Sequence, residues 1–177
     1  MRVSRLSSLL GRSLLPILQE EPRQGWDTVF ASHQLHEVTM YYPMRVIRTT
    51  QYKLILNLNY QAPFPIDQDF AVSPTFLDLL NRTRNHQETH WFSTLHKYYY
   101  RAPIELYNIM KDPHELNNLF NKPEYSSVLK SLLGQLKSWQ NATNDPWICA
   151  PQAVLEKTGC EALDNGIPLN PVLVLRP

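Results

Sequence analysis

The sequence contains few of the residues on which several large protein classes depend. Only 5 of its 177 residues are glycine, and it has neither a Gly-x-x-x-x-Gly-Lys loop nor a Gly-x-Ser-x-Gly elbow, so we predict no phosphate-binding loop. Lys and Arg number 17 against 16 Asp and Glu, which favours neither a nucleic-acid partner nor an acidic tail. No apolar run approaches the roughly 18 residues of a membrane helix. We therefore expect no nucleic acid and no membrane among its partners.

Cysteine is scarce as well. The two cysteines, Cys149 and Cys160, either close a small loop or remain two free thiols. Two Asn-x-Thr glycosylation sequons are present, at Asn81 and Asn141. Together with the cysteine pair, the sequons favour glycosylation in an oxidising, secretory compartment.

The N-terminal segment does not match that compartment. Residues 1–19 contain three arginines and no acidic residue, as a mitochondrial presequence does. No secretory signal peptide is predicted in this chain, because Arg12 and Pro16 interrupt the apolar run and no small-residue cleavage site follows. We interpret this mismatch as an indication that the natural start lies upstream.

The patterns that are present predict a small α+β domain. Runs of β-forming residues predict strands over residues 28–31, 36–42, 44–49, 52–58, 98–100 and 104–110. Only two residues separate 44–49 from 52–58, which predicts an antiparallel hairpin.

Three helices are predicted between and after these strands. Ser73 and Pro74 suit the start of a helix that ends near Arg82, after a loop over 59–72. Asp112, Pro113 and Glu115 form a capping pattern for a short helix that ends near Leu119. From Pro123 to Trp139, apolar residues at spacings of three and four predict a core-covering helix. The chain from Asn141 onward is expected to be irregular.

Three groups of residues are candidates for chemistry. His33 and His36-Glu37 have the wrong order for a zinc-binding His-Glu-x-x-His helix, and strand positions three apart point to opposite faces. Asp67 and Asp69 are either an acid–base pair or caps of local backbone. Cys149 is either a nucleophile or a buried or disulfide-bonded residue. From the residues alone, no catalytic constellation is visible.

Several motifs resemble the sulfatase family. The motifs are Glu-Leu-Tyr-Asn at 105–108 with Asp-Pro-His-Glu-Leu-Asn-Asn-Leu at 112–119, Gly-Arg-Ser-Leu-Leu-Pro at 11–16, and the segment 45–55. The resemblance implies the C-terminal subdomain of an alkaline-phosphatase-like fold, which is an antiparallel sheet of about four strands with a packed C-terminal helix. It also implies a division into the end of the catalytic domain with its connector (residues 1–43), the C-terminal subdomain (residues 44–160) and an irregular tail (residues 161–177).

The same resemblance implies which chemistry this chain lacks. Sulfatases use a formylglycine, made from Cys in Cys-x-Pro/Ala-x-Arg, together with a calcium ion held by Asp and Asn side chains. Both belong to the family's N-terminal region. Here Cys149 begins a similar pattern, but Ala153 stands where the arginine is needed. We therefore expect no catalytic residue and no metal ligand in this chain.

Longer stretches resemble one lysosomal member of the family, which hydrolyses N-sulfate from glucosamine residues of heparan sulfate. These stretches are residues 36–40, 42–45, 63–70, 72–76, 79–83, 98–102 and 145–151. The resemblance implies that substrate for the complete enzyme, and a homodimer. It also implies a Cys149–Cys160 bridge and a glycosylated Asn81.

Two alternatives stay open at this point. The resemblance implies that His36 and Glu37 lie where the two subdomains join, and these residues either contribute to the substrate pocket or bind neighbouring backbone or Arg45. The chain itself is either an inactive part of a sulfatase or a stand-alone, non-catalytic binding module derived from one.

Overall fold

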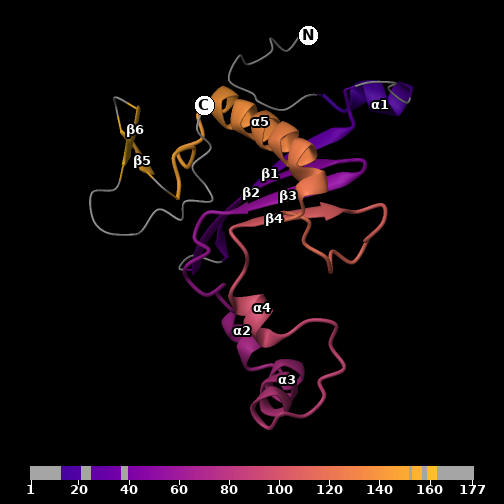
Figure 1. Cartoon of the computed structure of the whole chain (residues 1–177), viewed down its shortest axis with the longest axis vertical. Helices are drawn as coiled ribbons and strands as arrows, with labels where there is room; N and C mark the ends of the chain where they lie inside the picture. The colour runs from indigo at the N-terminus through magenta and orange to yellow at the C-terminus, as the bar shows by residue number, and fades with distance from the viewer. Residues whose placement is uncertain (1–12, 21–24, 37–39, 152, 157–158, 163–177) are drawn as a thin grey trace, which may run out of the picture.

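The computed structural model describes residues 13–20, 25–36, 40–151, 153–156 and 159–162, and side chains within 13–35 and 41–151 of these ranges. Its centre is a four-stranded antiparallel sheet in the order β1-β2-β3-β4 (Figure 1). The strands are β1 (Thr28–His36), β2 (Met40–Thr49), β3 (Tyr52–Asn57) and β4 (Ile104–Asn108). The α+β prediction, with about four antiparallel strands, is confirmed.

The predicted hairpin is β2 with β3. Its two-residue connection is held by the Thr49 hydroxyl, which accepts from the Tyr52 backbone N–H at 2.9 Å and lies 3.2 Å from the Tyr52 carbonyl oxygen. The expected separate strands 28–31 and 36–42 are wrong in their bounds. β1 instead runs on to His36 because it pairs with the whole length of β2, with one irregularity between His33 and Leu35.

One face of the sheet is covered by a long helix. A 3-10 turn, η1 (Pro123–Tyr125), leads into α5 (Ser126–Ala142). Leu132 and Leu136 of α5 are buried in one cluster with strand residues such as Leu54, and Phe30 of β1 stacks on Trp139 at 5.3 Å between ring centroids. The predicted core-covering helix is confirmed. We call β1–β4, η1 and α5 the sheet body.

Residues 58–103, between β3 and β4, form a second unit that we call the helical lobe. Figure 1 shows it at the opposite end of the molecule from α5. The lobe holds α2 (Gln68–Ala71), α3 (Pro74–Arg84) and α4 (Leu95–Tyr99). The prediction of α3 is confirmed, and the Ser73 hydroxyl accepts from the Phe76 N–H at 3.2 Å.

Two local predictions within the lobe are wrong. The expected loop 59–72 contains α2, which Asp67 caps through the Asp69 N–H at 2.8 Å. The expected strand at 98–100 lies largely in α4, because Thr94 caps the Lys97 N–H at 3.2 Å and starts a helix there. In both places a side-chain cap outweighs the β propensity or turn character of the following residues.

The expected short helix after Asp112 is also wrong. The Asp112 carboxylate accepts from the N–H groups of Leu116 and Asn117, at 3.1 and 2.8 Å, and so holds a wider turn. Glu115 has a φ of 56°, which a right-handed helix does not allow. Its carboxylate accepts from Lys53 Nζ on β3 at 2.8 and 2.9 Å, so a contact with the sheet replaces the expected capping box.

The two ends of the chain add small elements. Near the N-terminus, α1 (Leu15–Gln19) is a five-residue helix in which no residue is buried. Beyond α5, β5 (Ala153–Glu156) and β6 (Gly159–Ala162) pair as an antiparallel hairpin, where an irregular chain was expected. Within the described ranges, every helix is too short or too polar to cross a membrane.

Candidate functional site

The structure describes the predicted substrate-pocket residues only in part. The backbone of His36 pairs with Met40 at the end of β1, but its side chain and the whole of Glu37 lie outside the described residues. Their role stays a prediction. His33, on the same strand, has Nδ1 3.2 Å from the Tyr42 carbonyl oxygen. Among the side chains that the structure describes, no three His, Cys, Asp or Glu residues gather as a metal site would require.

The two predicted glycosylation sites are exposed, and the predicted disulfide cysteine Cys149 is buried. Asn81 is exposed on α3, and Asn141 is exposed in the last turn of α5. Cys149 is only 6% exposed, and no described cysteine is free. The side chain of Cys160 lies outside the described residues, so the Cys149–Cys160 bridge stays a prediction. A buried Cys149 lacks the access that a nucleophile needs.

A buried ion pair joins the sheet to the end of α5. Arg45 on β2 donates from Nε and Nη2 to the two carboxylate oxygens of Asp145, at 2.6 and 2.7 Å. Both side chains are at most 4% exposed. Asp145 also accepts from Gln140 Nε2 at 2.8 Å and from the Trp147 N–H at 3.1 Å. We call this pair the Arg45–Asp145 brace.

Both charged side chains of the brace have hydrogen-bond partners within the protein. Burial alone would raise the pKa of Asp145, but hydrogen bonds from Arg45 and Gln140 outweigh burial and hold that pKa below its ordinary value of 3.8. Arg45 Nη1 donates to the carbonyl oxygens of Met44 and His33, at 2.9 and 3.3 Å. The brace therefore serves to connect the sheet with the chain after α5 and does not present a charge to a ligand.

A second polar cluster, which we call the Glu105 clasp, closes the base of the helical lobe. The Glu105 carboxylate accepts from Asn57 Nδ2 (2.7 Å), from Arg101 Nε and Nη2 (2.9 and 2.8 Å) and from the Tyr107 hydroxyl (2.9 Å). Asn57 Nδ2 also donates to the Ala102 carbonyl at 2.6 Å. Because Asn57 directly precedes the lobe and Arg101 lies at its end, one carboxylate on β4 holds both ends of the lobe.

The charges of the clasp follow from its burial. Burial first, and then the neighbouring Glu105 carboxylate, raises the pKa of Tyr107, so this phenol stays a hydrogen-bond donor at any physiological pH. Burial alone would lower the pKa of Arg101, but its hydrogen bonds to Glu105 raise it. The Glu105 carboxylate is thus paired with Arg101 and accepts hydrogen bonds from Asn57 and Tyr107, so it is not an available general base.

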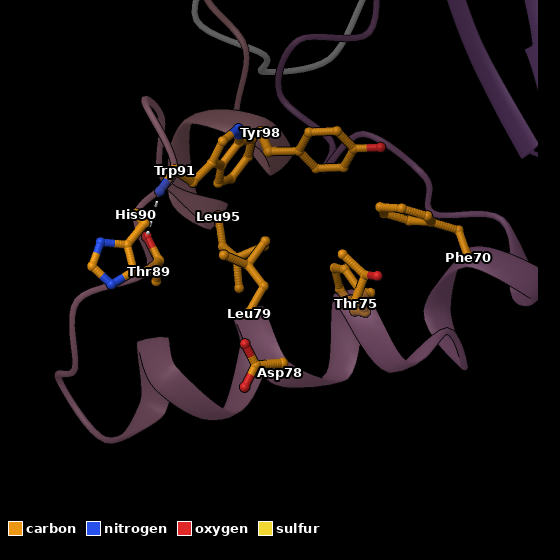
Figure 2. A pocket seen from close by; sticks show the side chains of 10 residues that line it. Phe70, Thr75, Asp78, Leu79, Thr89, His90, Trp91, Leu95 and Tyr98 are labelled. Atoms are coloured by element: carbon orange, nitrogen blue, oxygen red, sulfur yellow. Dashed lines mark hydrogen bonds between the residues drawn. The ribbon is translucent and has the colours of Figure 1, made fainter.

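The lobe itself contains a cavity of about 400 Å³. Figure 2 shows Trp91 and Tyr98 on one side of it, Leu79 and Thr75 of α3 on the other, and Phe70 at one end. The walls are mostly aromatic and aliphatic, and the lining is completed by Phe76, Asp78, Thr89, His90 and Leu95.

The polar side chains at the edge of this cavity have partners. Arg82 Nε donates to the Asp78 carboxylate at 2.7 Å, and His90 Nδ1 lies 3.5 Å from Glu88. All four side chains are at least 40% exposed, so they form a rim and not a buried reaction centre. The cavity has the size and character of a binding pocket, without the paired nucleophile and base of a hydrolase.

The fold resolves the alternatives for Asp67. The Asp67 carboxylate caps α2 and accepts from the Asp69 backbone N–H, so Asp67 serves local backbone. Sequence reasoning missed the brace, the clasp and the cavity. The partners of the brace lie 100 residues apart, and no local pattern points from one to the other.

No protein-family model matches the chain. Human N-sulphoglucosamine sulphohydrolase is 52% identical over 165 residues, which cover 92% of this chain and 32% of that protein. An ulvan-active sulfatase of Formosa agariphila is 26% identical over 137 residues, covering 76% of this chain and 25% of that protein. The chain thus spans about a third of the human relative and a quarter of the bacterial one.

Solved structures share the fold. BT4656, solved with its substrate D-glucosamine-2-N,6-O-disulfate, aligns with a TM-score of 0.51 at 23% identity, over 81% of this chain and 22% of its own. BT1596, a 2-O GAG sulfatase, aligns with a TM-score of 0.53 at 18% identity, over 91% of this chain and 24% of its own. The 52% identity to the human enzyme over 92% of this chain shows that the chain belongs to the sulfatase family, and the solved structures show the fold that it shares.

Proposed function

We propose that this chain is the C-terminal part of a lysosomal N-sulphoglucosamine sulphohydrolase, which hydrolyses N-sulfate from glucosamine residues of heparan sulfate. The observation that carries the proposal is the 52% identity to the human enzyme over 92% of this chain. The alignment covers 165 residues of this chain and so includes both the sheet body and the helical lobe. It favours the same substrate class for the complete protein.

In this proposal the chain supplies structure, and the reacting groups belong to the remainder of the enzyme. The formylglycine and the calcium ion would come from that remainder, because the described residues offer no cluster of metal ligands and Cys149 is buried. The sequence around Cys149 also has Ala153 in place of the motif's arginine. We therefore expect this chain alone to be inactive.

The proposal also gives the chain its internal division. Residues 1–43 would complete the catalytic domain and connect it to the C-terminal subdomain of residues 44–160, and the complete enzyme would be a homodimer. His36 and Glu37, at the junction, would contribute to the substrate pocket. Glu37→Gln in the complete enzyme tests this point: a raised KM at unchanged stability supports it, and unchanged kinetics contradict it.

A chimera tests the proposed function directly. The matching region of the human enzyme is replaced by this chain, and release of sulfate from N-sulfated glucosamine is measured. We expect sulfate release from the chimera and none from this chain alone. A folded chimera that carries formylglycine but releases no sulfate from this substrate would contradict the proposal.

The rival function, a non-catalytic binding module, has a separate test. The net charge of +1 gives this chain little electrostatic attraction for a sulfated glycan. We expect it to pass through a heparin column at physiological salt. Retention there would favour the binding module instead.

A further inference from the structure

We propose that Asn141, in the last turn of α5, carries an N-linked glycan. It opens the sequon Asn141-Ala142-Thr143, and Asn141 and Ala142 are exposed. The inference rests on the proposed function only for the compartment, because N-glycosylation requires entry into the secretory pathway.

The end of α5 separates an inner from an outer surface. Gln140 and Asp145 point inward, with 3% and 5% of their surfaces exposed, and they belong to the Arg45–Asp145 brace. Asn141 and Asn144 lie between them in sequence and are exposed. A glycan on the Asn141 side-chain amide would therefore extend into solvent and leave the brace undisturbed.

The hydrogen bonds of this turn indicate when the glycan is attached. The Thr143 hydroxyl, which defines the sequon, donates to the carbonyl oxygens of Trp139 and Gln140 at 2.9 and 3.3 Å. The Asn141 carbonyl accepts from the Thr143 and Asn144 N–H groups. Because folding engages the sequon in the helix end, transfer takes place before this turn forms, and the folded protein needs only to accommodate the product.

The glycan also restricts how the complete protein is assembled. If Asn141 carries a glycan, the outer side of the C-terminal end of α5 stays in solvent and is not covered by the rest of the enzyme. Asn81 provides the internal comparison: it is exposed on α3, in the helical lobe, with its Oδ1 accepting from Asn85 Nδ2 at 3.0 Å. The two sequons thus mark different units of the chain.

The test uses the full chain behind a secretory signal peptide, expressed in glycosylating eukaryotic cells. Mass is measured before and after removal of N-glycans, and glycopeptides are assigned by conversion of the modified Asn to Asp. We expect the Asn141 peptide to be converted. Asn141→Gln and Thr143→Ala should each remove one glycan, and Asn81→Gln should leave the glycan at Asn141 in place.

Thr143→Ser is the matched control, because serine keeps both the sequon and a hydroxyl for the helix end. It should retain the glycan that Thr143→Ala loses. An Asn141 peptide that stays unconverted in the parent chain overturns the inference. This result is independent of the chimera assay: an active chimera without a glycan at Asn141 contradicts only the glycan, and a glycosylated but inactive chimera contradicts only the proposed function.

Discussion

The sheet body and the helical lobe are stabilised in different ways. The body buries Ile47, Leu54, Leu106 and Leu136 completely, and its strands and α5 come from distant parts of the sequence. The lobe buries only Phe76 and Leu95 among its helical residues. It leaves several large apolar side chains more than 40% exposed, namely Phe70, Val72, Leu77 and Phe92.

An aromatic contact joins the two units. Phe64 packs edge-on against Tyr42 of β2 at 4.9 Å and against Tyr98 of α4 at 5.7 Å between ring centroids. The Glu105 clasp holds the ends of the lobe beside this aromatic contact. The comparison indicates that the body is one cooperative core, whereas the lobe depends on helix caps and on its attachment at the base.

The largest expected effect comes from removing one partner of the brace. Asp145→Ala leaves the Arg45 guanidinium buried without its carboxylate, and we expect the free energy of unfolding to fall by about 3–5 kcal/mol in urea denaturation. Asp78→Ala is the matched control in the lobe, since it breaks the exposed Asp78–Arg82 pair and should cost less than about 1 kcal/mol. An equal loss of unfolding free energy in Asp145→Ala and Asp78→Ala would contradict the contrast between the two units.

The same pair predicts a pH dependence. The pKa of Asp145 is lowered in the folded protein, so its contribution to stability is complete above the ordinary value of 3.8 and is lost as the pH falls through the lowered pKa. Urea midpoints measured across this range should fall more steeply for the parent chain than for Asp145→Ala. Parallel curves would contradict the assignment.

Truncation within the lobe should affect the lobe alone. Phe76 is 4% exposed. In a complete core, a Phe→Ala substitution lowers the free energy of unfolding by about 3–5 kcal/mol. For Phe76→Ala, the loss cannot exceed the stability of the lobe itself. Hydrogen exchange should accelerate at amides of residues 58–103, while β2 and β3 keep their protection. Equal acceleration in both would show a single cooperative unit.

A smaller effect is expected at the base of the lobe. Glu105→Gln keeps the shape but removes the charge that accepts from Arg101 and Tyr107, at a cost of about 1.5–3 kcal/mol. Exchange should rise in the lobe. Glu115→Gln, which weakens the less buried pair with Lys53, is the control and should leave the lobe unchanged.

The smallest effect is expected at a helix cap. Ser73→Ala removes the acceptor for the Phe76 N–H and should cost about 1 kcal/mol of local stability, seen as faster exchange in α3. Ser73→Asp should restore protection, because aspartate caps equally well. Failure of this rescue would mean that Ser73 acts by something other than capping.

Sequence reasoning succeeded and failed in both units. The β2–β3 hairpin, the start of α3 at Ser73 and the apolar stripe of α5 were predicted, because neighbouring residues encode them. The helix expected after Asp112 was wrong, since a contact between Glu115 and Lys53 of β3 competes with the local cap. The strand expected at 98–100 was wrong because Thr94 starts a helix instead.

By itself the sequence determined the α+β class, the periodic elements and the family motifs, since each depends on residues close together in the chain. Only the tertiary structure decided the full length of β1, the placement of the lobe, the Glu105 clasp and the Arg45–Asp145 brace. These features join residues up to 100 positions apart. Which distant groups meet depends on how the sheet is ordered and packed, and short-range patterns carry no information about that.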